Sequence, residues 1–327
     1  MNSIISTKKL TKVFGGKVKA VDALDLEVAK GEIFGFLGPN GAGKTTTLRM
    51  LATLLPIEIG EATVAGRDVR RQPSKVRRHI GYVGQLGGAD RLATGREDLI
   101  LQGHLYGMSS SEVKKRTEEL IEVLDLKDFA DRKGSTYSGG QRRRLEVALG
   151  IMHRPEVLFL DEPTTGLDPQ NRANLWVQIR KLRDSGTTIF LTTHYLEEAD
   201  VLSDRLAIMD HGKIVAQGTS RELKQQIAGD SVIISFKNDG ETTGKAVQLL
   251  KRQPYVREAI IEDEQVHLYV KEGAAALPEL LRLLDRENMA PKTITMSEPT
   301  LDDVFLRQTG RSLRDTGPNS KGNGESK

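Results

Sequence analysis

The stretch GPNGAGKTT, residues 38–46, constrains the fold of this chain more than any other. It follows an apolar run, EIFGFLG (32–38), and opens a helical pattern over 43–55. Glycines in such a loop let the backbone curl until successive N–H groups point at one centre, which suits a phosphate group. Strand, loop and helix together satisfy the context that the G-x-x-x-x-G-K-[ST] motif requires. The sequence therefore predicts an α/β fold with a nucleoside triphosphate in this loop.

Each residue of the loop has an expected place around that nucleotide. Lys44 can reach the β- and γ-phosphates, and the Thr45 hydroxyl is a candidate ligand for Mg²⁺. Thr46 adds a hydroxyl or a backbone contact near the α-phosphate. The remaining residues form the loop that surrounds the phosphates: Gly38, Pro39, Asn40, Gly41, Ala42 and Gly43.

Two adjacent carboxylates end a second apolar run, VLFLDE (157–162). Burying Asp161 there is costly unless it faces a cation, so Mg²⁺ is its expected partner. Glu162 points to the other face of the strand end, where it can polarise or position the water that attacks the γ-phosphate. The plainer alternative is that Glu162 caps the next turn, PTTGLDP (163–169).

A second glycine turn, YSGGQ (137–141), precedes another predicted helix. Ser138, Gly139 and Gly140 are expected to leave backbone N–H groups unshielded at the start of that helix, where the helix dipole favours an anion. The following run Arg142-Arg143-Arg144 cannot form one patch, because consecutive helical residues point in different directions. We expect these arginines to be solvated or paired with neighbouring acids.

Short β-branched runs alternate with helical patterns up to about residue 225, which is typical of α/β structure with strands buried on both faces. Strands are predicted over 32–38, 79–85, 156–162, 187–194 and 205–212, and helices over 43–55, 111–126, 140–152, 170–185 and 195–203. Alternating residues near the start and around 211–218 predict antiparallel strands beside this parallel core.

The pattern restarts near residue 230 in the order β-α-β-β-α-β, which matches a ferredoxin-like domain. A short helix, LDDVFLRQ, follows, and the polar tail over 311–327 is predicted to be disordered. The net charge of +3 gives no reason to expect a nucleic-acid binder. The absence of cysteine excludes disulfides and metal sites with thiolate ligands. No apolar run is long enough to span a bilayer.

These motifs occur in the order found in ABC-transporter ATP-binding subunits. The chain resembles most closely the drug-exporter ATPases of the daunorubicin-resistance type, through YSGGQRRRL, PEVLFLDEPTTGLDP, YLEEAD and EPTLDDVFLRQTG. The resemblance implies an ABC ATP-binding domain over 1–228, with a helical subdomain over about 88–150. It also implies a ferredoxin-like accessory domain with a closing helix over 229–310.

The resemblance assigns further roles residue by residue. Phe14 sits where the family stacks an aromatic ring on adenine, with a core residue of the first strand as the alternative. Gln85 matches the loop glutamine that ligates Mg²⁺ and senses the membrane partner; Gly84 stands before it where many relatives have Pro, which is expected to loosen this loop. Asp168 matches the loop that contacts the opposite protomer, and it can also stabilise its own turn. His194 matches the switch histidine that contacts the γ-phosphate.

The implied function is ATP hydrolysis that powers efflux of a drug, antibiotic or lipid-like substrate. The catalytic residues are then Lys44, Glu162 and His194, and the metal ligands are Thr45, Gln85 and Asp161. Two copies sandwich two ATP·Mg²⁺, so Ser138, Gly139, Gly140 and Gln141 meet the nucleotide of the other copy.

The expected partner is an ABC-2-type polytopic permease on a separate chain, with no nucleic acid, at the cytoplasmic face of the cell membrane. The helical subdomain that carries 111–126 is the part that the family docks on its permease. A rival reading is a non-transport ABC protein acting on DNA or the ribosome; a single cassette without a heptad arm or zinc module speaks against it.

The C-terminal domain leaves three roles open: a regulatory ligand site, a dimer contact, or a clasp on the ATPase core. Leu301, Val304 and Phe305 lie at helical spacing and predict that the closing helix packs its apolar side on another surface.

Overall fold

The computed structural model describes residues 3–85, 87–226, 230–236, 240–262, 264–297, 299–310 and 312–313. It divides into two compact units, Met1–Gln217 and Gly218–Lys327. The predicted domain boundary at 228/229 lies outside the described residues, as does the predicted tail over 311–327 apart from Ser312 and Leu313, which are buried. Within the described ranges, none of the helices combines the length and the apolar character that a membrane span needs.

A six-stranded sheet with the order β10-β9-β3-β8-β7-β6 forms the centre of the first unit. Its strands are β3 (Ile33–Leu37), β6 (Ile80–Val83), β7 (Val157–Asp161), β8 (Thr188–Thr193), β9 (Arg205–Asp210) and β10 (Lys213–Gly218). β3, β7 and β8 pair in parallel and are buried at every position, as strands covered on both faces should be. All the carboxyl ends of these strands therefore meet at one edge.

A second, antiparallel sheet with the order β2-β1-β4-β5 confirms the antiparallel part predicted near the start of the chain. It consists of β1 (Ser3–Phe14), β2 (Val18–Ala29), β4 (Ile59–Val64) and β5 (Arg67–Asp68). The strand predicted around 211–218 is β10, at the edge of the central sheet, where only His211 and Gly212 separate it from its neighbour β9, as in an antiparallel hairpin.

The helices of the first unit are α1 (Lys44–Leu51), α2 (Pro73–Arg77), α3 (Gly95–Leu105), α4 (Ser110–Val123), α5 (Gly139–Gly150), α6 (Pro169–Asp184) and α7 (Leu196–Leu202), with a 3₁₀ turn at Gly134–Thr136. The pattern analysis missed α3, whose apolar residues do not follow one stripe. A full capping box defines its start: Thr94 accepts from the Glu97 N–H, and Glu97 accepts from the Thr94 N–H.

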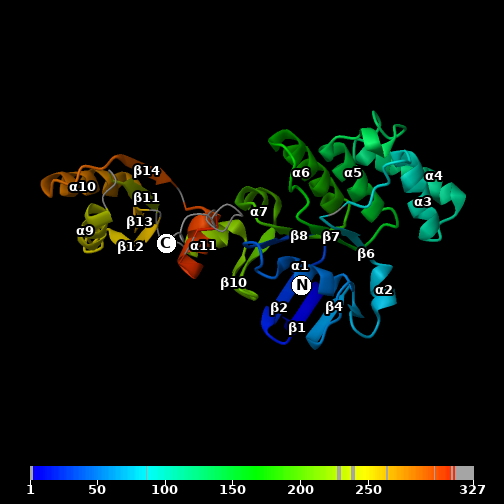
Figure 1. Cartoon of the computed structure of the whole chain (residues 1–327), viewed down its shortest axis with the longest axis horizontal. Coiled ribbons are helices and arrows are strands. Elements are labelled where there is room, and N and C mark those ends of the chain that lie inside the picture. The colour runs from blue at the N-terminus through cyan, green and yellow to red at the C-terminus, as the bar shows by residue number, and fades with distance from the viewer. Residues whose placement is uncertain are drawn as a thin grey trace, which may run out of the picture. The chain divides into compact units, whose positions relative to one another are not determined.

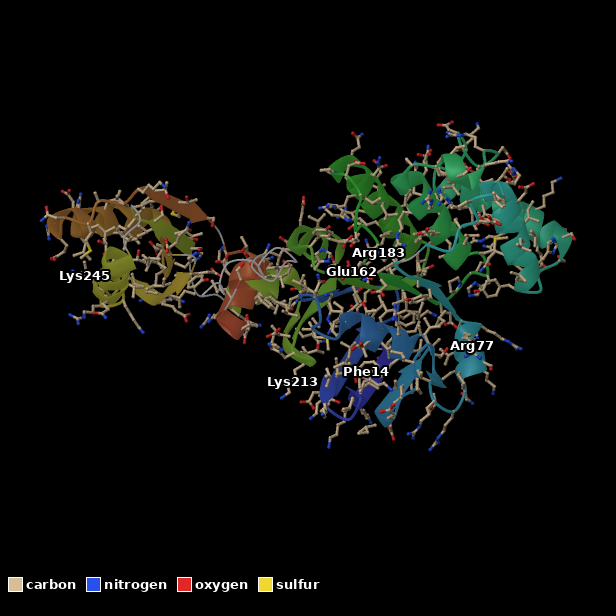
Figure 2. All side chains as sticks on the ribbon, in the orientation of Figure 1. Phe14, Arg77, Glu162, Arg183, Lys213 and Lys245 are labelled. Carbon is tan, nitrogen blue, oxygen red and sulfur yellow. The ribbon has the colours of Figure 1, made fainter. Side chains whose placement is uncertain are left out.

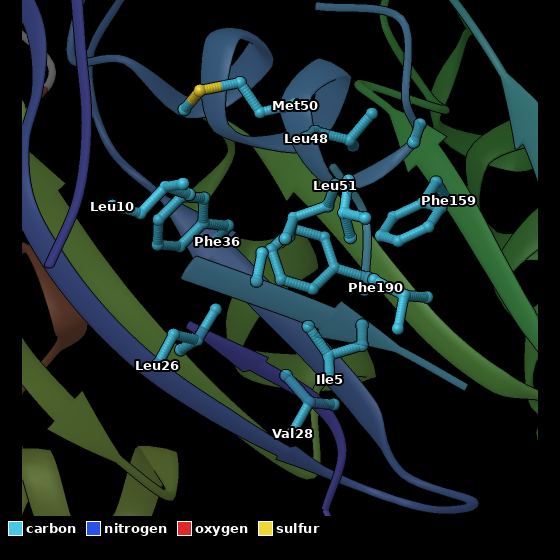
Figure 3. Packing of buried hydrophobic residues seen from close by; sticks show 14 of the residues in the cluster. Ile5, Leu10, Leu26, Val28, Phe36, Leu48, Met50, Leu51, Phe159 and Phe190 are labelled. Carbon is cyan, nitrogen blue, oxygen red and sulfur yellow. The ribbon is translucent and has the colours of Figure 1, made fainter. Parts of the chain in front are cut away.

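The two sheets share one apolar core, and α1 packs into it (Figure 3). The Phe190 ring lies 5.6 Å from the Phe34 ring centroid, 5.5 Å from that of Phe36 and 5.7 Å from that of Phe159. A separate core holds the helices α3 to α6 against the other face of the central sheet (Figure 1). The central sheet is therefore packed on both faces, and α1 belongs to the core on one of them.

The second unit begins with α8 (Ser220–Gln226) and contains β11 (Asp230–Ser235), α9 (Gly240–Leu250), β12 (Val256–Glu262), β13 (Gln265–Val270), α10 (Gly273–Arg286) and β14 (Thr293–Ser297). This is the predicted β-α-β-β-α-β order, and the sheet order β12-β13-β11-β14 is that of a ferredoxin-like fold.

The closing helix α11 (Leu301–Thr309) buries Leu301, Val304 and Phe305, as its spacing predicted. It packs on α8, within its own unit. Its Asp303 is buried and accepts hydrogen bonds from the Tyr269 hydroxyl (3.1 Å) and the Ser231 hydroxyl (3.4 Å).

Candidate functional site

The phosphate loop joins β3 to α1 by a path that only small residues allow. Gly43, the residue before α1, has φ = 105°, and a Cβ there would lie 2.1 Å from the Ala20 carbonyl oxygen. A Cβ on Gly38 would lie 2.2 Å from the Met209 carbonyl oxygen. The loop is thus wedged against β2 and β9, and side chains at these two positions would push it out of place.

Lys44 is buried at the start of α1, and its Nζ donates to the carbonyl oxygens of Gly38 (2.7 Å) and Pro39 (3.0 Å). Burial lowers the pKa of Lys44, while the carboxylates of Glu162 and Asp161 act in the opposite direction. The ammonium group is therefore inside the loop, next to two acids.

Asp161, at the end of β7, is completely buried. Its Oδ1 accepts hydrogen bonds from the hydroxyls of Thr45 (2.8 Å) and Thr192 (2.7 Å). Its Oδ2 is also buried and has no hydrogen-bond partner in the described part of the chain. The loop threonine and the strand-end acid are thus in contact, with one carboxylate oxygen left to bind a cation.

Glu162 follows in the left-handed region, at φ = 46°, an uncommon conformation for a residue with a side chain. Its N–H bonds the carbonyl (3.1 Å) and the hydroxyl (3.0 Å) of Thr192. The carboxylate lies 3.8 Å from Lys44 Nζ and 3.3 Å from His194 Nδ1, the latter without hydrogen-bond alignment. The three predicted catalytic side chains therefore come together, from three different elements.

The ionisation of Glu162 depends on these neighbours. Burial by itself would raise the pKa, but His194, Lys44 and the Thr165 hydroxyl outweigh it and lower the pKa below the ordinary value. The Thr165 hydroxyl also donates to Oε2 (3.2 Å), so the turn contact that the plainer alternative predicted is present as well. The carboxylate is ionised at neutral pH and can accept a proton.

The second glycine turn forms a capping box at the start of α5. The Gln141 N–H donates to Ser138 Oγ (3.2 Å), and the Ser138 N–H donates to the Gln141 side chain (3.0 Å). The prediction of unshielded N–H groups was therefore wrong for Ser138, and the Gln141 N–H is occupied as well. Helix geometry leaves the N–H groups of Gly139 and Gly140 without an intrahelical acceptor.

Asp168 caps α6 by accepting the Asn171 N–H (3.0 Å), so its turn-stabilising contact is present. These hydrogen bonds to Asn171 lower the pKa of Asp168. A Cβ on Gly140 would lie 2.4 Å from Asn171 Oδ1. The starts of α5 and α6 are thus in direct contact, and the glycine turn and Asp168 lie side by side.

Two predicted site residues lie apart from the others. Phe14 is 42% exposed, which removes the alternative of a core residue (Figure 2). Gln85 follows β6, is exposed, and lines a cavity of about 410 Å³ with Arg49, Tyr82 and Tyr106 among others. No hydrogen bond joins Gln85 to Thr45 or Asp161 among the described residues.

Comparison with known proteins decides the family. A family model described as ABC transporter matches residues 21–165, and one for the C-terminal domain of ATP-binding proteins like DrrA1-3 matches residues 218–309. The daunorubicin/doxorubicin resistance ATP-binding protein DrrA of Streptomyces peucetius is 43% identical, over 95% of this chain and 94% of that protein. The chain belongs to the ATP-binding subunits of ABC transporters.

Other members of the family extend this likeness. The Nod factor export ATP-binding protein I of Rhizobium sp. is 38% identical over 92% of this chain and 95% of its own length. Among solved structures, a post-hydrolysis dimer of an ATP-binding cassette bound to ADP and Pi is 26% identical, with a TM-score of 0.60 over 66% of this chain and 98% of that one. This chain is accordingly an ATPase of the drug-resistance and export type, and it binds nucleotide.

Sequence reasoning overlooked Arg143 of this ATPase. Of the three consecutive arginines, Arg144 pairs with Asp125 at 2.8 Å and Arg143 pairs with Glu146, so the expected pairing with neighbouring acids is confirmed for both. What the sequence did not indicate is that Arg143 is buried. Its guanidinium donates to the carbonyls of Gly84 (2.7 Å) and Pro163 (2.8 Å) and pairs with Glu146 at 2.9 Å.

These contacts join α5 to both loops of the site. Gly84 precedes Gln85, and Pro163 follows Glu162; the same guanidinium also reaches the Asp161 carbonyl at 3.3 Å. The loop that Gly84 was expected to loosen is therefore held by Arg143. The i, i+3 spacing to Glu146 was a signal available in the sequence, but burial of the pair was not.

We predict that Arg143→Met lowers kcat while ATP binding is retained, because the positions of Gln85 and Glu162 are lost and the phosphate loop is untouched. Unfolding should also become easier by about 3–5 kcal/mol, since Glu146 is left buried and unpaired. Adding Glu146→Leu should recover stability but not kcat. Denaturation measures the stability, and phosphate release measures kcat. If the double variant recovers both, Arg143 has only a structural role.

Proposed function

We propose that this subunit binds ATP·Mg²⁺ in the loop 38–46 and drives efflux of a drug, antibiotic or lipid-like molecule through a separate ABC-2-type permease. The observation that carries this proposal is the convergence of Lys44, Glu162 and His194 at the end of the phosphate loop. The substrate class comes from the names of the relatives, which refer to resistance to daunorubicin, doxorubicin and linearmycin and to export of Nod factor.

In this mechanism, Glu162 accepts the proton of the water that attacks the γ-phosphate. Its lowered pKa keeps it ionised, and the left-handed turn aims it at the loop. Lys44 exchanges its bonds to the Gly38 and Pro39 carbonyls for bonds to phosphate oxygens, and so offsets their charge. His194, beside Glu162, contacts the γ-phosphate from the other side.

The donor set fits Mg²⁺, which prefers oxygen ligands and keeps several waters beside substrate phosphates. Thr45 and Asp161 would hold it, since Asp161 Oδ2 is buried without a partner in the described part of the chain. Gln85 would join them on movement of its loop. Bound there, Mg²⁺ neutralises charge on the β- and γ-phosphates.

The other half of each site comes from a second copy of this chain. No hydrogen bond or ion pair among the described residues joins Ser138–Gln141 to the phosphate loop, yet Gly139 and Gly140 offer N–H groups at a helix start. In a dimer these groups would bind the γ-phosphate held by the partner subunit. Phe14, exposed on the antiparallel sheet, would stack on adenine.

The permease would dock on α3 and the cavity beside it. Exposed apolar side chains are dense on this helix and the residues that flank it: Leu92 (80% exposed), Ile100, Leu101, Leu105 (73% exposed) and Tyr106. Contiguous exposed apolar residues beside a cavity are typical of a protein interface. A short amphipathic segment of the permease fits this face, at the cytoplasmic surface of the membrane, and Gln85 in the cavity would sense it.

We predict that Glu162→Gln retains ATP binding, loses nearly all hydrolysis and accumulates as an ATP-stabilised dimer, because the general base is removed and the charge within the closed site falls. Phosphate release and size-exclusion chromatography with ATP measure these effects. Unchanged turnover would remove Glu162 from the mechanism.

We predict that Ser138→Arg, introduced into Glu162→Gln, abolishes the ATP-stabilised dimer but leaves ATP binding by the monomer intact. The added side chain fills the space that the partner's γ-phosphate needs. Ser135→Arg is a matched control, since Ser135 is exposed three residues before Ser138. A dimer that survives Ser138→Arg contradicts the composite site.

We predict that Leu101→Asp with Leu105→Asp prevents co-purification of the permease, while the ATPase activity of the isolated subunit is unchanged, because both side chains are exposed. Val177→Asp, at an exposed position on α6, serves as the control. Normal co-purification of the double variant would place the docking face elsewhere.

A further inference from the structure

A dense group of positive charges lies in residues 67–79, RDVRRQPSKVRRH, which span β5, the following turn and α2. This segment holds six Lys and Arg against one Asp, a net charge of +5. The whole chain carries only +3, so all other residues together amount to −2. The weak overall charge, which gave no case for a polyanionic partner, hides a strongly basic surface.

Five of these cations form what we call the basic patch; all are exposed: Arg70, Arg71, Lys75, Arg77 and Arg78. Only one of them has an acid within 4.0 Å among the described residues, Arg71 with Asp68 at 3.9 Å. The Asp68 side chain also binds the backbone, because its Oδ1 accepts hydrogen bonds from the N–H groups of Arg70 (2.9 Å) and Arg71 (2.7 Å). The charge of the patch is thus largely uncompensated within the chain.

The patch is held on the folded core. Val69 and Val76 are buried in the apolar cluster beneath it, which anchors the turn and α2 between them. Figure 2 shows Arg77 on α2 at the outer surface of the first unit. Its guanidinium donates to the Thr53 hydroxyl, just beyond the end of α1, at 3.2 Å.

The patch also borders the cavity beside α3. Arg49, one helical turn before Thr53, is exposed and lines that cavity. From the other side, α2 contacts β6, which leads directly to the cavity residues Gly84 and Gln85. A surface that meets the permease in the cavity therefore continues into five uncompensated cations.

We propose that the basic patch binds the headgroups of anionic phospholipids next to the permease. The proposal rests on the docking face given above, because only docking there turns the patch toward the membrane. Charge complementarity selects the occupant: clustered Lys and Arg at the cytoplasmic surface attract anionic lipid over about one Debye length, some 10 Å at 0.1 M salt. The contact would hold the ATPase at the bilayer and orient it.

Sedimentation of the full-length protein with lipid vesicles tests this. Vesicles of phosphatidylcholine mixed with phosphatidylglycerol should bind the protein at low salt, and vesicles of phosphatidylcholine alone should not. Replacing all five patch residues by Gln should weaken binding at least about tenfold, since each Lys or Arg near an anionic surface contributes separately. High salt should abolish the difference between the two vesicle types.

The matched control replaces five exposed lysines elsewhere in the first unit by Gln, which changes the net charge equally: Lys8, Lys9, Lys30, Lys114 and Lys181. This variant should bind nearly as well as the unaltered protein. Equal loss in both variants would mean that overall charge, and no defined patch, is responsible, and would overturn the proposal. Binding to RNA without binding to anionic vesicles would overturn it in favour of a nucleic acid.

ATPase activity and circular dichroism of the patch variant establish that it is folded. Vesicle binding by the isolated subunit requires neither the permease nor hydrolysis, so its outcome is separate from the docking experiment. Loss of permease binding by the α3 variant together with unaltered vesicle binding would support both surfaces. If vesicle binding survives neutralisation of the basic patch, the lipid contact is refuted, while the proposed docking of the permease is unaffected.

Discussion

A buried carboxylate is costly unless its oxygens are hydrogen-bonded or paired, and Asp161 at the end of β7 is completely buried. Two hydroxyls, from Thr45 at the start of α1 and Thr192 at the end of β8, satisfy one of its oxygens. These bonds tie the phosphate loop to the two central strands. The second oxygen has no partner in the described part of the chain, which suits a site completed by a nucleotide and its cation.

A buried cation on α5 contacts the strand end that carries this acid. Arg143 binds the backbone on both sides of the acidic strand end, and its pair with Glu146 lowers the cost of burying it. The helix whose first residues would meet the partner's nucleotide is thus attached to the loops of Gln85 and Glu162 in its own chain. In the proposed dimer, closure of one composite site would in this way reach the residues proposed for hydrolysis in the other.

Much of this arrangement was predictable, because the local sequence patterns and the tertiary packing favour the same strands, helices and loops. GPNGAGKTT between an apolar strand and a helix defined the nucleotide loop, and the restart near residue 230 defined a ferredoxin-like unit. α3 escaped notice because its exposed apolar residues, Leu101 and Leu105 among them, blur the helical stripe. The same exposure makes α3 the candidate docking face, so the feature that weakens the helical pattern is the one on which the proposed docking rests.

The sequence by itself determined the order of elements and the identity of the loop residues, because glycine spacing, apolar periodicity and adjacent acids act over a few positions. Only the tertiary structure decided which side chains meet. Lys44, Glu162 and His194 are brought together by the parallel pairing of β3, β7 and β8, and Arg143 is turned inward by the packing of α5. Burial and long-range contact are properties of the packed chain, which one-dimensional spacing does not encode.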